Sequence, residues 1–335
     1  MTAPPLTVAV TTGIGHGDLD RLCPGREMRW GNCDFLLNPP PGTKCDYWIV
    51  YAAARDRDHM RVETENTLFI AGEPPSKKIY PKSYYAQFHR VVSAHAADPH
   101  PRVTTSALGL PWHVGLDRDK DRYLYGYDEL SAMQPAPDRD AKISVICSDL
   151  KTTEGQRKRL VFLERLKREM PGRVIHFGRG FEPIADKMSV ITPHRFHLVL
   201  ENSCSMDYWT EKLADAYLGW AYPIYAGCPN LNDYFEETGF TAINLDRPDE
   251  AISRIAELIE NDYVDTQALA ECRRRILNDY NPFARFAHWA EKFHQTIPAN
   301  GSVSITSHKA FRPFPRGLIH RLKSCPPHEQ IPPTH

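Results

Sequence analysis

The regular alternation of apolar segments and helical patterns after residue 140 is the feature that most constrains the fold of this 335-residue chain. Short runs rich in β-branched and aromatic residues, typical of buried strands, occupy residues 143–147, 174–177, 196–200, 222–225 and 241–245. Between them, apolar side chains recur at helical spacing in residues 156–170, 209–220 and 248–260. Strand–helix alternation of this kind predicts an α/β fold with a largely parallel sheet.

The first half of the chain also predicts strands, although the segments between them are less regular. These strands are expected at residues 6–10, 47–52, 67–71 and 90–93. The stretch 128–140 lacks periodicity and holds two prolines, so it is the best linker candidate. A chain of this length suggests about two domains. We therefore expect two α/β halves, with a ligand-binding cleft between the carboxyl ends of their sheets.

Composition and charge exclude several classes of protein. The chain has 41 Lys and Arg against 42 Asp and Glu, so its net charge of −1 gives no general attraction to nucleic acid. Its apolar runs are shorter than the roughly 20 residues that span a bilayer, and the N-terminus has no signal-peptide pattern. The eight cysteines form no CxxC pair, so the usual zinc spacing is absent. These features predict a reduced cytoplasmic protein.

Two further patterns have weak functional interpretations. Asp-x-Asp triplets, which can hold a divalent metal against a diphosphate, begin at Asp56, Asp117 and Asp138. Each lies in a polar, arginine-rich loop, which favours a solvated loop over a metal site. The spacings of His95, His100 and His113 do not place three ligands on one helical face. We therefore predict no metal site from either pattern.

The most informative segment runs from Phe196 to Gly227. A predicted buried strand ends in Glu201-Asn202-Ser203, a short polar loop follows, and Thr210-Glu211-Lys212 opens the next helix. A helix N-terminus at the carboxyl edge of a parallel sheet attracts anions, and Lys212 adds a full positive charge for phosphate oxygens. Glu211 is suited to accept hydrogen bonds from sugar hydroxyls. A plain helix cap explains Glu211 but not Lys212, so a phosphate-bearing ligand is favoured.

The same segment resembles the signature of glycosyltransferase family 10, the α1,3/α1,4-fucosyltransferases, in its bacterial form. That signature is a Phe-x-Leu-x-Phe-Glu-Asn-[Ser/Thr] strand end, a loop with tyrosine, Thr-Glu-Lys at a helix start, and a Pro-[Val/Ile]-x-x-Gly strand. Here the corresponding positions are residues 196–203, Tyr208, residues 210–212 and residues 223–227. The resemblance extends over about residues 140–280.

The resemblance implies the GT-B form of the α/β class, in which two Rossmann-like domains face each other across a cleft. It places an N-terminal acceptor-side domain at residues 1–135 and a C-terminal nucleotide-sugar-binding domain at 140–280. A helix within 281–300 is expected to pack back toward the N-terminal domain. A basic, proline-rich tail is expected at 301–335.

The activity implied is an inverting transfer of fucose from GDP-fucose to a hydroxyl of a glycan acceptor, with no obligatory cofactor. Glu73, in a stretch that resembles the Gly-Glu segment of bacterial members, would act as general base. Lys212 and Arg159 would stabilise the departing diphosphate. Arg157 is an alternative to Arg159, but the apolar spacing of the helix favours Arg159. The Leu-Pro-Trp stretch at residues 110–112 also resembles a segment of the family's N-terminal half, to which no role is assigned.

The resemblance also implies a set of donor-binding residues, and the chain departs from the family in one place near them. Bacterial members often have lysine where this chain has Arg195. The implied donor-binding residues are Arg157, Glu201, Asn202, Ser203, Tyr208, Thr210, Glu211 and Lys212.

Three alternatives to this function remain open. The first is a related transferase that uses another nucleotide sugar. The second is a non-catalytic glycan-binding module on the same scaffold, which Glu73 and the Thr-Glu-Lys trio argue against. The third and weaker one is a metal-dependent GT-A transferase that uses one of the Asp-x-Asp triplets.

The C-terminal tail suggests a further partner. Between Glu291 and Glu329 the chain has no acidic residue, while lysines and arginines alternate with apolar side chains. Such segments bind anionic membrane surfaces. The tail also lacks periodicity from about residue 298. Two interpretations follow: residues 302–325 contact the inner face of a membrane peripherally, or the segment is a disordered solubilising tail.

Overall fold

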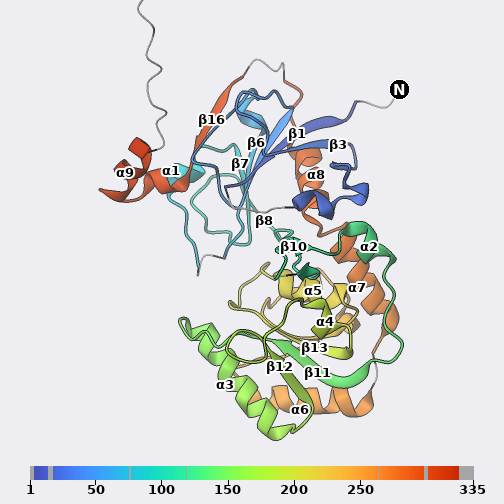
Figure 1. Ribbon diagram of the computed structural model, residues 1–335. Helices are drawn as coiled ribbons and strands as arrows, with labels where there is room; N and C mark the ends of the chain where they lie inside the picture. The colour runs from blue at the N-terminus through green and yellow to red at the C-terminus, as the bar shows by residue number, and fades with distance from the viewer. Residues whose placement is uncertain are drawn as a thin grey trace, which may run out of the picture. The chain divides into compact units, whose positions relative to one another are not determined.

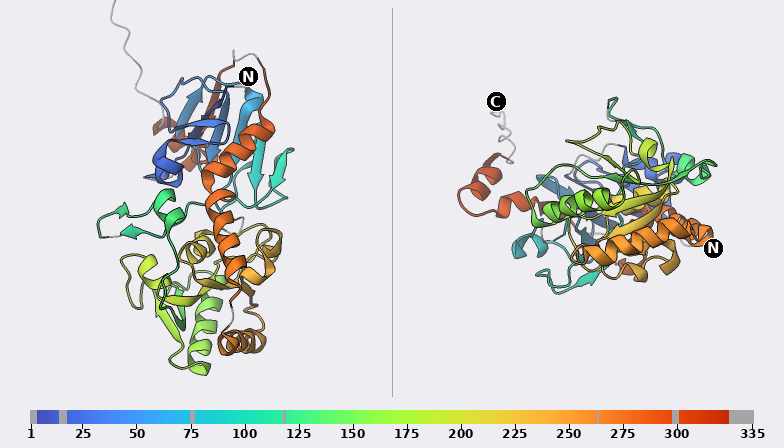
Figure 2. Two further views of the ribbon diagram at one scale, coloured as in Figure 1. Left: turned by 90° about the vertical axis from the view of Figure 1, so that its right-hand side faces the viewer. Right: turned by 90° about the horizontal axis from the view of Figure 1, so that it is seen from below.

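The computed structural model describes residues 4–13, 18–74, 77–117, 119–262, 264–297 and 301–323. For residues 321–323 it describes the backbone only. The chain divides into two compact units, drawn in Figures 1 and 2. Unit 1 combines residues 1–16, 32–104 and 289–335, and unit 2 combines residues 17–31 and 105–288. The division falls within helix α8 (Pro282–Phe293).

Unit 1 is built on parallel strands, which Figure 2 shows side by side. Their order is β3-β1-β4-β6-β7, with β1 at Leu6–Thr11, β3 at Cys33–Leu37, β4 at Tyr47–Tyr51, β6 at Thr67–Ile70 and β7 at Arg90–Ser93. Four of these strands confirm the sequence prediction, and β3 was missed. The shorter elements of this unit are β5 (Arg57–Met60), β8 (Val103–Thr105), α1 (Lys82–Tyr85) and the 3-10 turn η3 (Thr64–Asn66), whereas β2 (Arg29–Trp30) falls within the residues of unit 2.

An apolar core of aromatic rings fills unit 1. Every residue of β4 is buried, as expected of a central parallel strand. The indole of Trp48 in β4 donates a hydrogen bond to the hydroxyl of Thr11 at 3.0 Å, which satisfies its buried polar atom. Phe69 in β6 packs edge-on against Tyr80 and Tyr84. Burial of these rings adds to the hydrophobic stabilisation of this unit.

The expectation of an irregular tail after residue 298 is wrong for the described part. Strand β16 (Val303–Thr306) pairs antiparallel with β5, and a 3-10 turn η6 (His308–Phe311) and helix α9 (Arg316–Lys323) follow. Ile305 is fully buried, and Thr306 exchanges two hydrogen bonds with Gln87 at 2.8 and 3.1 Å. A four-residue strand carries too few side chains to show a period in the sequence. Residues 324–335 lie outside the described residues.

Unit 2 contains the predicted parallel sheet. Its strand order is β12-β11-β13-β14-β15, with β11 at Asp140–Ile146, β12 at Val174–Phe177, β13 at His194–Leu200, β14 at Tyr222–Ala226 and β15 at Thr241–Ala242. Helices α3 (Glu154–Glu169) and α6 (Pro248–Asn261) cover one face, and α4 (Met188–Ile191) and α5 (Glu211–Leu218) cover the other (Figure 1). The predicted α/β alternation is therefore confirmed.

Local signals explain where the helices of unit 2 begin. Thr153 and Gln156 cap α3 reciprocally: the Thr153 hydroxyl accepts from the Gln156 amide at 3.2 Å, and the Gln156 side chain accepts from the Thr153 amide at 3.1 Å. Pro248 opens α6, where its missing N–H costs nothing. Asp265 caps α7 (Thr266–Asn278).

Smaller elements complete unit 2. The stretch predicted as a linker begins with a helix, α2 (Tyr127–Ala132), in which the Glu129 side chain accepts from the Gly126 amide at 2.8 Å. Strands β9 (Leu116–Asp117) and β10 (Arg122–Tyr123) pair antiparallel, and four 3-10 turns occupy Leu19–Leu22, Pro24–Arg26, Leu231–Asp233 and Glu237–Gly239. Within the part of the chain that the structure describes, no helix has the length and apolar character that crossing a bilayer requires.

Candidate functional site

The strand β13 carries the predicted signature to the carboxyl edge of the unit 2 sheet. Glu201 follows the last residue of the strand and is 5% exposed. Its amide donates to the Ala226 carbonyl at the end of β14 at 2.9 Å. A Cβ atom on Gly227 would lie 2.6 Å from the Glu201 side chain, so only glycine fits beside it. Glu201 is therefore held between the ends of two neighbouring strands.

Glu201 fixes the N-terminus of α5. Its carboxylate accepts hydrogen bonds from the amide and the hydroxyl of Thr210, each at 2.8 Å. The Thr210 hydroxyl in turn accepts from the Lys212 amide at 3.3 Å, as an N-cap residue does. The polar atoms of Glu201 and Thr210 are thus used within the protein, which suits a positioning role better than direct contact with a donor.

Lys212 lies within reach of two carboxylates. Its ammonium group is 3.3 Å from Glu201 and 3.2 Å from Glu211, and it donates to the Thr210 hydroxyl at 3.0 Å. Burial alone would lower the pKa of Lys212, but Glu201 and then Glu211 raise it above its usual value. Burial opposes ionisation of Glu211 as well, yet Lys212 and Lys187 hold its pKa below the usual range. Both groups are therefore charged at neutral pH.

Arg159 is a buried cation without a buried anion. It projects from α3, is 4% exposed, and donates one hydrogen bond, to the Leu200 carbonyl at 3.2 Å. Its Nε is buried and has no hydrogen-bond partner, and no carboxylate forms an ion pair with it, among the described residues. Burying a charge without compensation is costly. An anionic ligand at this position would remove that cost.

Arg157, the alternative to Arg159, has a different environment. It is exposed, and its guanidinium donates to the carbonyl of Lys151, in the loop before α3, at 3.0 Å. A surface arginine of this kind is already solvated. The burial of the two side chains therefore separates two candidates that the sequence left open, and it favours Arg159.

Arg159 and Lys212 lie at the same end of the sheet. A Cβ atom on Gly155, in the first turn of α3, would be 2.4 Å from the Asn202 carbonyl, so this turn packs closely on the loop after β13. Burial raises the pKa of the Cys147 thiol at the end of β11, and the positive charges of Arg159 and Lys212 oppose that rise. Both cations are thus close to one strand end.

The loop from Asn202 to Trp209 is held by a polar contact that the sequence did not predict. The Asp207 amide donates to the Asn230 side chain at 2.9 Å, and the Asp207 carboxylate accepts from the Asn230 amide group at 2.8 Å. Within this loop Asn202 is exposed, Ser203 is half-buried and Tyr208 is buried. Asn202 and Ser203 are therefore the more accessible of the predicted donor-binding residues here.

A second charged cluster lies beside the first and was missed in the sequence. Asp215, one turn further along α5, is 1% exposed and forms an ion pair with Lys187 at 2.5 Å. The same carboxylate accepts from the amides of His113 and Val114 at 2.8 and 3.0 Å. No local motif connects these residues, because His113 and Asp215 are 102 positions apart.

Glu73, the predicted general base, belongs to unit 1, whereas the other predicted site residues belong to unit 2. It follows β6 at the carboxyl edge of the unit 1 sheet, and its carboxylate is 28% exposed and 2.5 Å from the Lys77 ammonium. A Cβ atom on Gly72 would lie 2.5 Å from that of Ala52, so glycine is required where the chain leaves the strand. The carboxyl group is thus accessible and lies next to a cation.

Each Asp-x-Asp triplet has a cation or a histidine of its own. Asp58 pairs with Arg55 at 2.6 Å, Asp117 with Lys120 at 3.0 Å, and Asp140 with His194 at 2.6 Å. Across the described ranges, no three His, Cys, Asp or Glu side chains are close enough together to hold a metal ion.

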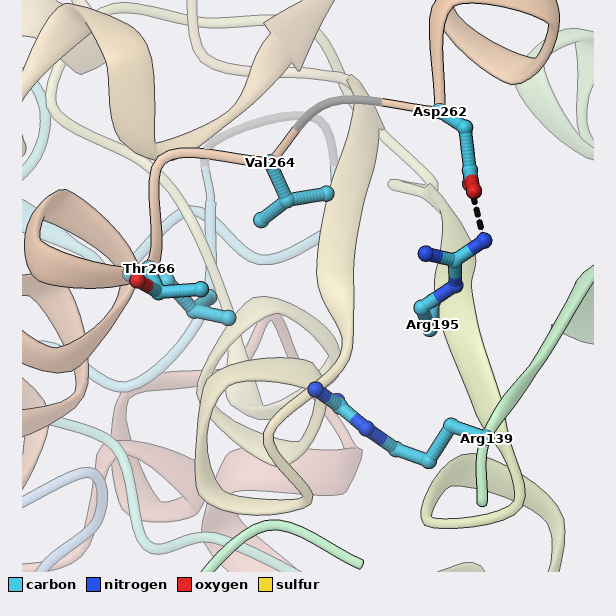
Figure 3. Close-up of a pocket in the computed structure, with 6 residues that line it drawn as sticks. Arg139, Arg195, Asp262, Val264 and Thr266 are labelled. Carbon is cyan, nitrogen blue, oxygen red and sulfur yellow. Dashed lines mark hydrogen bonds and ion pairs between the residues drawn. The ribbon is translucent and has the colours of Figure 1, made fainter. Parts of the chain in front are cut away.

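A cavity of about 180 Å³ lies at the amino end of the unit 2 sheet (Figure 3). Arg195, the departure from the family pattern, lines it and forms an ion pair with Asp262. Arg195 is near the start of β13, whereas Glu201 follows its end. The departure therefore lies at the opposite end of β13 from the Thr-Glu-Lys region. The lining residues are Arg139, Arg195, Asp262, Val264, Thr266 and Leu269.

Comparison with known families decides the class of this protein. A family model described as "Glycosyltransferase family 10 (fucosyltransferase) C-term" matches residues 136–308, more than half of the chain. The chain belongs to glycosyltransferase family 10. The resemblance inferred from residues 196–227 is therefore confirmed, and the protein is a glycosyltransferase. Two units with parallel sheets, in a member of this family, also confirm the predicted GT-B class.

Several solved structures are similar to this family 10 chain. One is an α1,3-fucosyltransferase with GDP-fucose, at 18% identity and a TM-score of 0.48, covering 90% of this chain and 94% of that one. Another is an α1,3-fucosyltransferase with GDP, at 18% identity and a TM-score of 0.46, covering 84% and 93%. A third, "Trehalose-6-phosphate from E. coli bound with UDP-2-fluoro glucose", has 9% identity and a TM-score of 0.45, covering 76% and 74%. No curated protein matches the chain.

Proposed function

We propose that this protein transfers fucose from GDP-fucose to a hydroxyl of a glycan acceptor, with inversion at the sugar carbon. The observation that carries the proposal is the buried guanidinium of Arg159, which has no carboxylate partner among the described residues, at the sheet edge where Lys212 opens α5. A nucleotide-sugar donor leaves as a diphosphate, and positive charge at that position stabilises the transition state. Family membership agrees with this choice.

The charge balance of the site supports a role for Arg159 beyond that of Lys212. Glu201, Glu211 and Lys212 bring two carboxyl groups and one ammonium group together, so this trio alone is not suited to attract a diphosphate. Lys187 is compensated by Asp215, so Arg159 and the N-terminus of α5 supply the additional positive potential that a diphosphate requires. Because the Glu201 oxygens already bind Thr210 and Lys212, Glu211 is the carboxylate left to bind hydroxyls of the donor.

In the proposed reaction, Glu73 accepts the proton of the acceptor hydroxyl as that oxygen attacks the anomeric carbon of fucose. The bond from this carbon to the diphosphate breaks, and its electron pair leaves with GDP. Lys212 and Arg159 stabilise the charge on the departing diphosphate, with Arg157 as the less favoured candidate. Asn202, Ser203 and Tyr208 are proposed to contact the donor. The mechanism uses cationic side chains where other transferases use a metal ion.

A panel of nucleotides tests the identity of the donor. GDP and GDP-fucose are expected to raise the melting temperature, since a ligand that binds only the folded state stabilises it. Thermal shifts with GDP, UDP, CMP and their sugars are the measurement. Stabilisation by UDP but not GDP would favour a transferase for another nucleotide sugar. Glycan binding without any transfer or donor hydrolysis would favour the non-catalytic module.

We further propose that the C-terminal segment contacts an anionic membrane surface. In its described part, Phe314, Leu318 and Ile319 are 84%, 49% and 46% exposed. Basic residues, among them Arg312 and Arg316, lie in the same stretch. Apolar side chains next to cations suit the boundary between lipid headgroups and acyl chains.

Two truncations separate this membrane contact from folding. A chain ending at Ser302 loses β16 and its buried Ile305, so we expect a lower melting temperature. A chain ending at Pro313 retains β16 and η6, loses α9, and is expected to keep its melting temperature. Co-sedimentation with anionic and with neutral vesicles is the measurement. If the Pro313 chain binds anionic vesicles as the full chain does, the membrane proposal fails.

A further inference from the structure

His113 lies on a segment whose backbone forms several hydrogen bonds to side chains distant in the sequence. Its amide and that of Val114 donate to the buried Asp215 carboxylate, and the Gly115 amide donates to Asp186 at 2.8 Å. The preceding Trp112 is 1% exposed, and its carbonyl accepts from Arg21 at 2.7 Å. Three consecutive amides and one carbonyl thus fix the backbone on either side of the imidazole.

The ion pair between Lys187 and Asp215 stabilises the buried carboxylate that binds the His113 and Val114 amides. Asp215 is almost fully buried, and the Lys187 side chain is 13% exposed. A buried carboxylate with a cation and two amide donors has its lone pairs well satisfied. The pair therefore attaches the His113 segment to α5, the helix that Thr210, Glu211 and Lys212 open.

The imidazole of His113 is neutral, and one of its ring nitrogens can bind a ligand. Burial is the main cause that lowers the pKa of His113, and together with Lys187 and Arg21 it outweighs the opposing effects of Asp215 and Glu211. Its Nδ1 is 2.9 Å from the Tyr123 hydroxyl, and among the described residues Nε2 has no hydrogen-bond partner. The Arg21 guanidinium lies 3.5 Å from the centre of the Tyr123 ring. A hydroxyl beside a cation is the better proton donor, which favours Nδ1 as acceptor and Nε2 as donor.

Glu211 is the neighbouring group of opposite hydrogen-bonding character. Glu211 and Asp215 are four residues apart in α5 and therefore lie on one face of the helix. Because the His113 amide is bound to Asp215 on that face, Glu211 is a neighbour of His113, and the mutual electrostatic effects of the two side chains agree with this. An ionised carboxylate only accepts hydrogen bonds, whereas a neutral imidazole with a protonated Nε2 donates one. A hydroxyl group, which both donates and accepts, satisfies this combination; a phosphate oxygen does not, because it cannot donate to Glu211.

We infer that His113 is a donor-contacting residue that binds, together with Glu211, a hydroxyl group of the nucleotide sugar. Lys187, Asp215 and Tyr123 are positioning residues for its imidazole. This inference rests on the proposed function, because it presupposes a nucleotide-sugar donor. It also assigns a role to the stretch around residues 110–112, which presents His113 to α5.

Calorimetry with three ligands tests the inference. For His113→Ala we expect the affinity for GDP-fucose to fall about tenfold, the factor that corresponds to roughly 1.4 kcal/mol, while inorganic pyrophosphate binds as to the wild type. Loss of GDP affinity as well would place the hydroxyl on the ribose, and an unchanged GDP affinity would place it on fucose. His288→Ala, on the exposed side of α8, is the matched control.

Two variants guard against a purely structural effect. Tyr123→Phe retains the buried ring and removes only the hydroxyl that orients Nδ1, so a smaller loss of GDP-fucose affinity is expected at an unchanged melting temperature. His113→Gln can still donate a hydrogen bond and should recover part of the loss. Equal GDP-fucose affinity in His113→Ala and wild type would overturn the inference, as would an equal loss of pyrophosphate affinity. A wild type that binds none of the three ligands would instead overturn the proposed function.

Discussion

Lys212→Ala is expected to lower kcat/KM at least ~100-fold, the size of effect that loss of one group stabilising transition-state charge produces. The ammonium group lies at the N-terminus of α5 and is the accessible cation of its cluster, with 23% of the side chain exposed. Steady-state kinetics with GDP-fucose and a glycan acceptor are the measurement. Lys167→Ala, which removes an exposed lysine of α3, is the matched control and should retain wild-type rates.

Loss of Lys212 also leaves Glu201 and Glu211 without their cation, so part of the effect could come from a rearranged site. Lys212→Arg keeps the charge and is expected to recover part of the activity. The melting temperature should be recorded for both variants, because a buried carboxylate that loses its partner destabilises the fold. Wild-type turnover in Lys212→Ala would remove its assigned role.

Glu73→Gln is expected to lower kcat at least ~100-fold with little change in the affinity for GDP, since an amide cannot accept the proton of the acceptor hydroxyl. The substitution keeps the size of the side chain and removes its ion pair with Lys77, which is exposed and contributes little to stability. Rates at saturating donor and calorimetry with GDP are the two measurements.

The matched control for this variant is Glu65→Gln, a glutamate of η3 in the same unit. It should leave both quantities unchanged. If Glu73→Gln turns over as fast as the wild type, another group must accept the proton. If it loses affinity for GDP in proportion to kcat, Glu73 contacts the donor and is not a base.

The sequence predicted the elements whose determinants are contiguous. The strand, loop and helix around Glu201 and Lys212 lie within one segment, so buried alternation, the Thr210 cap and the family signature all point to the same local structure. Helix α3 could be predicted from its apolar spacing, but the choice between Arg157 and Arg159 needed the burial of each side chain. Exposure depends on what packs against the helix, which the sequence does not state.

What the sequence could not predict depends on contacts between distant residues. Lys187 and Asp215 are 28 positions apart, and neither belongs to a motif. His113 drew attention only as a metal-ligand candidate, because nothing near it in the sequence identifies Asp215 as the acceptor of its amide. Strand β16 is short, and it is stabilised by its partner β5 more than by its own residues. Pairing of this kind is visible only in three dimensions.

The central claim is that Arg159 and Lys212 form a site for the diphosphate of a nucleotide sugar, and calorimetry with GDP on one matched pair of variants tests it most directly. We predict that the wild type and Arg157→Ala bind GDP with similar affinity, and that Arg159→Ala binds it at least about tenfold more weakly, as expected for a lost charge-assisted contact. Equal GDP binding by Arg159→Ala and the wild type, or no heat of binding in the wild type, would contradict the account.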